Sequence, residues 1–99
     1  MGSDNAGRLD RRAVYGISVA AELTGVSPQN LRAYEAKGLI APARTDGGTR
    51  RYSDHDVARV DRITVLLAAG LNLAGVSLVL DLQDETRRLR RRIATLQDD

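Results

Sequence analysis

The 99-residue chain contains no cysteine, which excludes disulfide bonds, cysteine-ligated zinc and iron–sulfur clusters within it. Long apolar runs are also missing, because the longest patch, ITVLLAAGL, is far below the roughly 18 residues that a membrane span needs. The first residues contain no apolar h-region, so a secretory leader is not expected, and the opening MGSDNAG has Ala6 where a myristoylation pattern needs serine or threonine. With 42% hydrophobic and 28% charged residues, the sequence predicts one small globular domain in the cytoplasm.

Aromatic residues and lysine are scarce. The chain has three tyrosines as its only aromatic residues, and Lys37 is its only lysine, so arginine carries nearly all of the positive charge behind a net charge of +2. The arginines gather at Arg8–Arg12, Arg44–Arg51 and Arg87–Arg92. A guanidinium fork suits phosphate and base edges better than an ammonium does. An arginine bias is also typical of a GC-rich genome, so only the positions of the arginines indicate a function.

The stretch ISVAAELTGVSPQNLRAYEAKG predicts two short helices joined by a turn. We expect Ser18 to cap the first helix, and Val19, Leu23 and Val26 to lie close to one apolar face. Gly25 supplies the left-handed conformation that ends a helix.

The second helix is predicted to run from about 28 to 37. Ser27 is a good N-cap, and Pro28 stands at the first helical position, where its missing N–H costs nothing. The spacing of Ala21, Gly25 and Leu31 is typical of a helix-turn-helix, which needs a small residue, a turn glycine and a core residue where its helices cross. An ordinary helical hairpin is the alternative.

After Gly38, the sequence predicts a two-stranded wing from residues 39–44 and 49–52, joined by a turn through DGG. Pro42 suits an edge strand, where its lost donor faces solvent. A third helix is expected to open at Ser53, with Ser53 and Asp56 at capping-box spacing. Its predicted apolar face holds Val57, Val60, Ile63, Thr64 and Leu67. A fourth helix, capped by Asn72, is predicted to use Leu73, Val76, Val79 and Leu80.

The last segment has apolar residues spaced alternately by three and four, as in a coiled coil. We call these residues the seam: Val79, Leu82, Thr86, Leu89, Ile93 and Leu96. Arginines fill most positions between them, and a helix that polar cannot bury its stripe against itself. The pattern favours pairing with a second copy of the chain, and the alternative is a terminal helix folded back on its own domain.

The exposed face of the second helix carries side chains suited to DNA. Gln29 and Asn30 can pair with adenine edges, and Arg32 with guanine or phosphate. Arginines flank the wing turn where phosphates would run, and the tyrosine hydroxyls are expected to point outward and donate to phosphate oxygens. The alternatives are core tyrosines with solvated hydroxyls and a solvated Arg51. The predicted DNA-binding residues are Ser27, Gln29, Asn30, Arg32, Tyr34, Lys37, Arg44, Arg50, Arg51 and Tyr52.

The run LRAYEAKGLIAPARTDGGTRRYSDHDV resembles the DNA-binding domain of the bacterial MerR family of transcription regulators. The residues that carry the resemblance are Arg32, Tyr34, Glu35, Gly38, Leu39, Arg44, Arg50, Tyr52, Ser53 and Asp56. Ala33 and Thr49 replace aromatic residues that are common in the family. With the segment GLNLAGVSLVLDLQDE, these departures are more similar to the heat-shock repressor branch, HspR, than to the metal-sensing or drug-sensing branches.

The resemblance implies a mostly α fold, a winged helix-turn-helix with a small two-stranded wing and a C-terminal coiled-coil dimerisation helix. We expect a flexible tail over 1–14, the DNA-binding domain over 15–82 and the dimerisation helix over 83–99. A homodimer joined by an antiparallel coiled coil would bind a pseudo-palindromic double-stranded promoter site at the nucleoid. The branch implies repression with the chaperone DnaK as co-repressor, and no cofactor is expected.

Two other classes of function are the alternatives. An excisionase-like architectural module or a protein-interaction module also uses a small winged helix-turn-helix, but such proteins usually end soon after the wing. An enzyme would need more than His55, the only histidine, which lies between Asp54 and Asp56 at a helix start. No nucleophile, metal set or phosphate loop accompanies it, so a solvated first-turn residue is the better interpretation.

Overall fold

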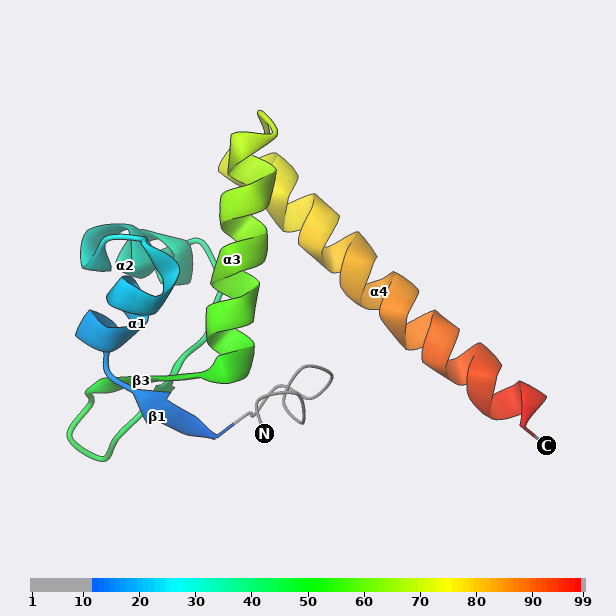
Figure 1. The fold of residues 1–99 in the computed structure, drawn as a ribbon, viewed down its shortest axis with the longest axis horizontal. Helices are drawn as coiled ribbons and strands as arrows, with labels where there is room; N and C mark the ends of the chain where they lie inside the picture. Colours follow the sequence, from blue (N-terminus) through cyan, green and yellow to red (C-terminus); the bar gives the residue numbers. More distant parts are fainter. Residues whose placement is uncertain (1–11, 99) are drawn as a thin grey trace. The chain divides into compact units, whose positions relative to one another are not determined.

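The structure, a computed structural model, describes residues 12–98. The elements follow one another as β1 (Ala13–Tyr15), α1 (Ile17–Thr24), α2 (Pro28–Ala36), β2 (Ala43–Arg44), β3 (Arg50–Ser53), α3 (Asp54–Ala68) and α4 (Leu73–Gln97) (Figure 1). The chain divides into two compact units, one ending at Thr64 and the other beginning at Val65. Most of the tail predicted over 1–14 lies outside the described residues.

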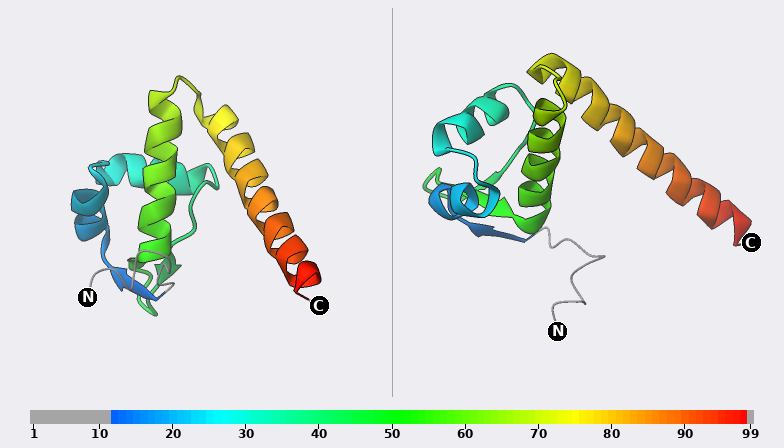
Figure 2. Two further views of the ribbon diagram at one scale, coloured as in Figure 1. Left: turned by 45° about the vertical axis from the view of Figure 1, so that its right-hand side comes forward. Right: turned by 45° about the horizontal axis from the view of Figure 1, so that its top comes forward.

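The first helix starts earlier than its sequence indicates. The N-cap of α1 is Gly16, which makes no side-chain capping bond, so the prediction of Ser18 as the cap is wrong. Of the predicted apolar face only Val26 is buried, whereas Val19 and Leu23 are 44% and 53% exposed, and the buried residue within α1 is Ala20. The prediction is therefore wrong for Val19 and Leu23. A small side chain such as that of Ala20 permits the close approach of α1 and α2, which lie together in both views of Figure 2.

The turn and the second helix follow the prediction. Gly25 caps α1 in the left-handed region (φ 74°), and its N–H donates to the Ala21 carbonyl at 2.8 Å. The Ser27 hydroxyl accepts the Asn30 N–H at 3.1 Å, and Pro28 opens α2. Because α2 buries Leu31 completely, the unit has the core residue that a helix-turn-helix requires.

The wing contains one strand more than predicted. The sheet order is β1-β3-β2 with both pairs antiparallel, and Arg44 is opposite Arg50 in the ribbon. The Thr45 N–H donates to the Thr49 carbonyl at 2.8 Å across the turn. The missed strand β1 pairs its Tyr15 with Tyr52, so the predictions of a two-stranded wing and of a tail reaching residue 14 are corrected. A three-residue strand has too short a pattern to be recognised, because pairing with β3 creates it.

The third helix starts where β3 ends. Ser53 and Asp56 form the predicted capping box: the Ser53 N–H donates to Asp56 Oδ2 at 2.8 Å, and the Asp56 N–H to Ser53 Oγ at 3.0 Å. On α3, Val60 and Ile63 are buried as expected. Thr64 is exposed and its hydroxyl donates to the Val60 carbonyl at 3.2 Å, so its place in the apolar face is corrected.

The second unit holds the end of α3 and the whole of α4. Asn72 caps α4 as predicted, since its Oδ1 accepts the Gly75 N–H at 2.8 Å. Val76 and Leu80 are buried, and α4 continues unbroken through the expected boundary between residues 82 and 83. From residue 81 to 98 every position is exposed. Within residues 12–98, no helix is both long and apolar enough to cross a membrane.

Candidate nucleic-acid interface

The exposed face of α2 is polar. Leu31 and Tyr34 point into the core and fix the orientation of the helix, which leaves the remaining predicted contact residues of this segment exposed to solvent. These exposed residues are Ser27, Gln29, Asn30, Arg32 and Lys37. They offer amide, hydroxyl and cationic groups on one short helix, which is the chemistry that base edges and phosphates require.

The wing is tied to α2 by a residue that the predicted site did not include. Glu35 lies on α2 between two wing arginines: its Oε2 is 2.8 Å from Arg44 Nη2, and its Oε1 is 2.5 Å from Arg50 Nε. Arg44 also donates through Nη1 to the Gly48 carbonyl in the wing turn at 3.1 Å. These contacts join α2, strand β2, strand β3 and the turn into one charged cluster, which we call the wing triad (Glu35, Arg44, Arg50).

The triad changes the electrostatics of its members. The hydrogen bond from Arg50 lowers the pKa of Glu35, against the opposing effect of partial burial, and both arginines add to the lowering through their charge. The same hydrogen bond raises the pKa of Arg50. Both shifts favour the ionised forms of Glu35 and Arg50.

The two tyrosines near the site are core residues. Tyr34 is 7% exposed and Tyr52 is 0% exposed, so both rings pack inside as expected. The expectation that the Tyr52 hydroxyl points outward is wrong, because its oxygen is buried and has no hydrogen-bond partner among the described residues. Burial, followed by the nearby charge of Glu35, raises the pKa of this phenol. Tyr52 is therefore a core residue of strand β3.

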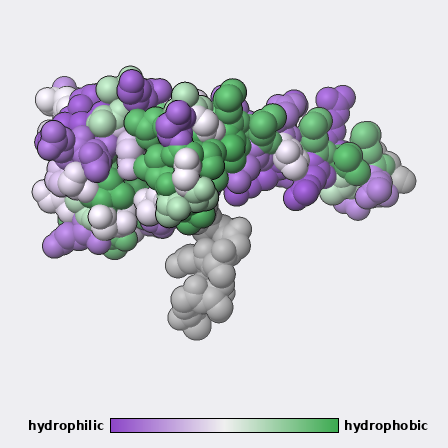
Figure 3. All heavy atoms as spheres, turned by 90° about the horizontal axis from the view of Figure 1, so that it is seen from above, coloured by the Kyte–Doolittle hydropathy of each residue, from purple (hydrophilic) through white to green (hydrophobic). Residues whose placement is uncertain are grey.

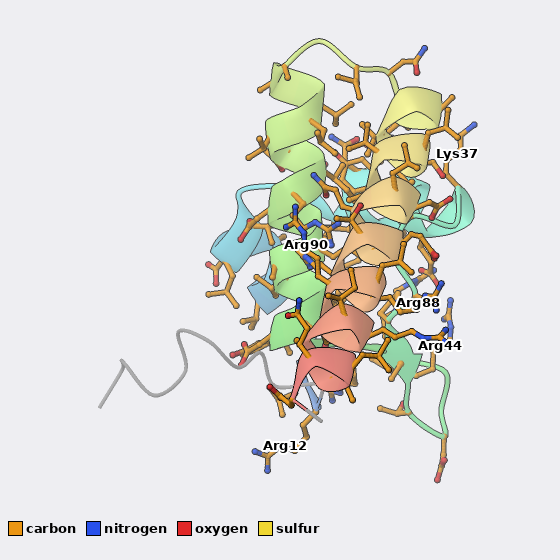
Figure 4. All side chains as sticks on the ribbon, turned by 90° about the vertical axis from the view of Figure 1, so that its right-hand side faces the viewer. Arg12, Lys37, Arg44, Arg88 and Arg90 are labelled. Atoms are coloured by element: carbon orange, nitrogen blue, oxygen red, sulfur yellow. The ribbon has the colours of Figure 1, made fainter. Side chains whose placement is uncertain are left out.

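The structure separates Arg51 from the other wing arginines. Neighbouring residues of a strand project to opposite faces, and Arg50 reaches Glu35 whereas Arg51 extends toward the start of α1. There, Arg51 Nη1 is 3.4 Å from the position that a Cβ on Gly16 would occupy. Figure 4 shows Lys37 at the end of α2 and Arg44 on the wing projecting on the same side in that view. The predicted cationic groups therefore do not all meet at one point.

A groove of about 340 Å³ lies between the segment 38–41 and the start of α3. His55, Asp56 and Arg59 line it, and Arg59 Nε donates to the Leu39 carbonyl at 2.6 Å. Asp56 is engaged in the capping box. Among residues 12–98, no three His, Cys, Asp or Glu side chains gather into a possible metal site.

An exposed polar helix after a tight turn, followed by an arginine-bearing wing, defines a winged helix-turn-helix protein. Residues 15–83 match the sequence pattern of the MerR HTH family of regulatory proteins, and the chain belongs to this family.

Several relatives of this chain are named as HTH-type transcriptional regulators. The chain is 43% identical over 84 residues to a Streptomyces coelicolor protein that is named heat shock protein HspR. The matched region covers 84% of this chain and 56% of that protein. The chain thus spans little more than half the length of this relative.

Two solved structures share the fold. One is MtaN, the N-terminal part of the Bacillus subtilis multidrug transporter activator, with a TM-score of 0.64 and 29% identity, covering 84% of this chain and 94% of that one. The other is HiNmlR, a MerR-family regulator that lacks the sensor domain, bound to promoter DNA. Its TM-score is 0.62 at 24% identity, with 84% of this chain and 79% of that one covered.

Proposed function

We propose that the chain is a transcriptional regulator that binds a pseudo-palindromic site in double-stranded promoter DNA as a homodimer. The observation that carries this proposal is the joining of the exposed face of α2 to the wing arginines through Glu35. Helix α2 can enter the major groove of DNA while the wing lies against the adjoining sugar-phosphate backbone. A role in binding rather than catalysis also agrees with relatives that are regulators.

Within this proposal the exposed residues divide into two roles. Gln29, Asn30 and Arg32 read base edges, because amide and guanidinium groups form paired hydrogen bonds with adenine and guanine. Phosphate oxygens are held by the second group of residues, Ser27, Lys37, Arg44, Arg50 and Arg51. The buried rings of Tyr34 and Tyr52 hold α2 and the wing in place beneath these contacts.

The exposed seam supports the homodimer. Leu82, Leu89, Ile93 and Leu96 are between 44% and 66% exposed in the single chain. In Figure 3 apolar side chains recur along the visible face of α4, with polar side chains beside them. A second copy, paired through an antiparallel coiled coil, would cover this stripe and set the distance between the two half-sites.

From the resemblance to the heat-shock repressor branch we infer repression as the output, with the chaperone DnaK as a protein co-regulator and the nucleoid, in the cytoplasm, as the location. Titration of a promoter duplex with and without the chaperone tests the partner, and the expected result is tighter binding in its presence. An unchanged affinity would remove the chaperone from the proposal and leave DNA binding intact.

A footprinting experiment tests the proposed function itself. We expect protection of a single two-fold symmetric site, with light scattering showing a dimer. A monomer that protects all duplexes equally would contradict the proposal and favour an architectural module instead.

A further inference from the structure

We propose that Glu35 is a positioning residue for sequence specificity: its carboxylate fixes Arg44 and Arg50 of the wing relative to α2. The wing can then contact phosphates only when the recognition helix has the correct register in the groove. This inference rests on the proposed function and concerns the same surface.

The geometry of the carboxylate supports this role. Each oxygen of Glu35 accepts from a different strand of the wing, Oε2 from Arg44 on β2 and Oε1 from Arg50 on β3. Arg44 is held at a third point by the Gly48 carbonyl. Because Glu35 bonds the Nε edge of Arg50, both Nη groups of that arginine make no hydrogen bond to the described residues and can donate to an anion.

Exposure separates the three members of the triad. The Glu35 side chain is 20% exposed, compared with 28% for Arg50 and 45% for Arg44, so the acid lies deepest and the guanidiniums extend outward. Because the partly buried carboxylate of Glu35 holds both guanidiniums, the outward N–H groups of Arg44 and Arg50 keep a fixed direction. Ordering of long arginine side chains before binding also reduces the entropy lost when they meet a phosphate.

The negative charge of Glu35 also supports a role in specificity. A carboxylate within a surface that faces phosphates is repelled by DNA, and its negative charge offsets that of one of the two arginines that it pairs with. A surface selected for affinity alone would have a neutral side chain at this position. Repulsion that acts on every duplex, together with contacts that form only in one register, favours the correct site over the wrong ones.

The test compares three variants on the duplex selected by the wild-type protein and on a scrambled duplex. Glu35→Gln removes the charge. Glu35→Asp keeps the charge but shortens the reach by one methylene, so that one carboxylate no longer spans both arginines. The matched control is Glu85→Gln, since Glu85 also pairs with an arginine, Arg88, but within α4. Thermal unfolding of each variant is measured alongside.

For both Glu35 variants we expect the ratio of selected to scrambled affinity to fall about tenfold or more, with thermal stability nearly unchanged. Binding of Glu35→Gln to the scrambled duplex should not weaken, and its log-affinity against log-salt slope should steepen by up to about 1 per monomer as an arginine charge is released. Glu35→Asp should keep the wild-type slope. Glu85→Gln should keep the wild-type ratio.

Two results would overturn the inference: an unchanged affinity ratio in both Glu35 variants, or a parallel loss on both duplexes together with lower thermal stability, which would show a purely structural role. The proposed function fails separately, if the wild-type protein itself does not distinguish the two duplexes. A discriminating wild-type protein with equally discriminating Glu35 variants would refute the role of Glu35 alone.

Discussion

Arg32 and Arg50 lie on the same candidate DNA-binding surface, but their surroundings suit them to different contacts. Arg32 is exposed on α2 and makes no ion pair with a described residue, whereas Arg50 is oriented by Glu35 on the wing. A freely projecting guanidinium at the recognition helix can select a base edge. An oriented guanidinium beside the groove is suited to the sugar-phosphate backbone, which is the same in every sequence.

Substitution of each arginine by alanine should separate these roles. Arg32→Ala should cost roughly 1 to 3 kcal/mol and relax the base preference at one position of each half-site. Arg50→Ala should weaken binding most on the selected duplex, where the wing contacts form, without changing the preferred base at any position. It should also reduce the magnitude of the salt slope by about 1 per monomer. Titrations at several salt concentrations on selected and scrambled duplexes measure both effects, with Arg91→Ala on α4 as the control. If Arg50→Ala preserves both affinity and slope, the wing does not contact the backbone as proposed.

Substitution of Tyr52 tests whether its hydroxyl contributes to stability or to DNA binding. Its hydroxyl is buried without a partner among the described residues, so Tyr52→Phe removes an unsatisfied polar group and keeps the ring. We expect the free energy of unfolding in urea to stay the same or rise, and DNA affinity to stay the same. A loss of affinity at constant stability would mean that the hydroxyl reaches a phosphate in the complex.

Among the elements, α3 depends on a local signal at its first turn. The Ser53 hydroxyl satisfies the Asp56 N–H, and Ser53 is 4% exposed. Ser53→Ala should lower the free energy of unfolding by about 1 kcal/mol. Ser18→Ala is the matched control, because Ser18 lies inside the first turn of α1 without capping it, and its effect should stay within about 0.5 kcal/mol. Denaturant titration of both variants measures the difference, and equal effects would contradict the capping role.

The same contrast shows which parts of the fold could be predicted. The caps at Ser27, Ser53 and Asn72 are local, since each side chain bonds a backbone group three residues away, and all three were predicted. Strand β1 exists because β3 pairs with it, and no short pattern in Ala13–Tyr15 announces that pairing. The burial of the Ala20 side chain likewise depends on how closely α2 approaches α1.

The candidate site was predictable in composition and less so in arrangement. Residue types and helix periodicity were enough to find the exposed face of α2. The partners of Glu35 are 9 and 15 residues away in the sequence, so only the fold brings them together. The Tyr-Glu pair of the family resemblance was the available signal for Glu35, and spacing alone could not assign it a contact.

At the scale of the whole molecule, binding of a two-fold symmetric site requires two copies of the chain. Leu89 and Ile93 are 44% and 54% exposed at the centre of the seam. Replacing both with aspartate should convert a dimer to a monomer, because charges would have to be buried against an apolar partner. Loss of the dimer should also abolish tight binding, since one half-site contributes only part of the affinity.

Light scattering and DNA titration measure the two effects together. The control variant carries Ala94→Asp and Thr95→Asp, which add two charges to α4 away from the seam and should leave the dimer intact. A seam variant that remains dimeric and binds normally would show that α4 does not join the two copies through these residues.

Selection of bound sequences from a pool of random double-stranded DNA tests the central claim most directly, because it measures specificity, half-site and spacing at once. The expected result is enrichment of one inverted repeat, with two identical half-sites at a fixed centre-to-centre distance set by the dimer. An unenriched pool, or enrichment of a single half-site with no symmetric partner, would contradict the account of a homodimer that reads a promoter site through α2 and the wing.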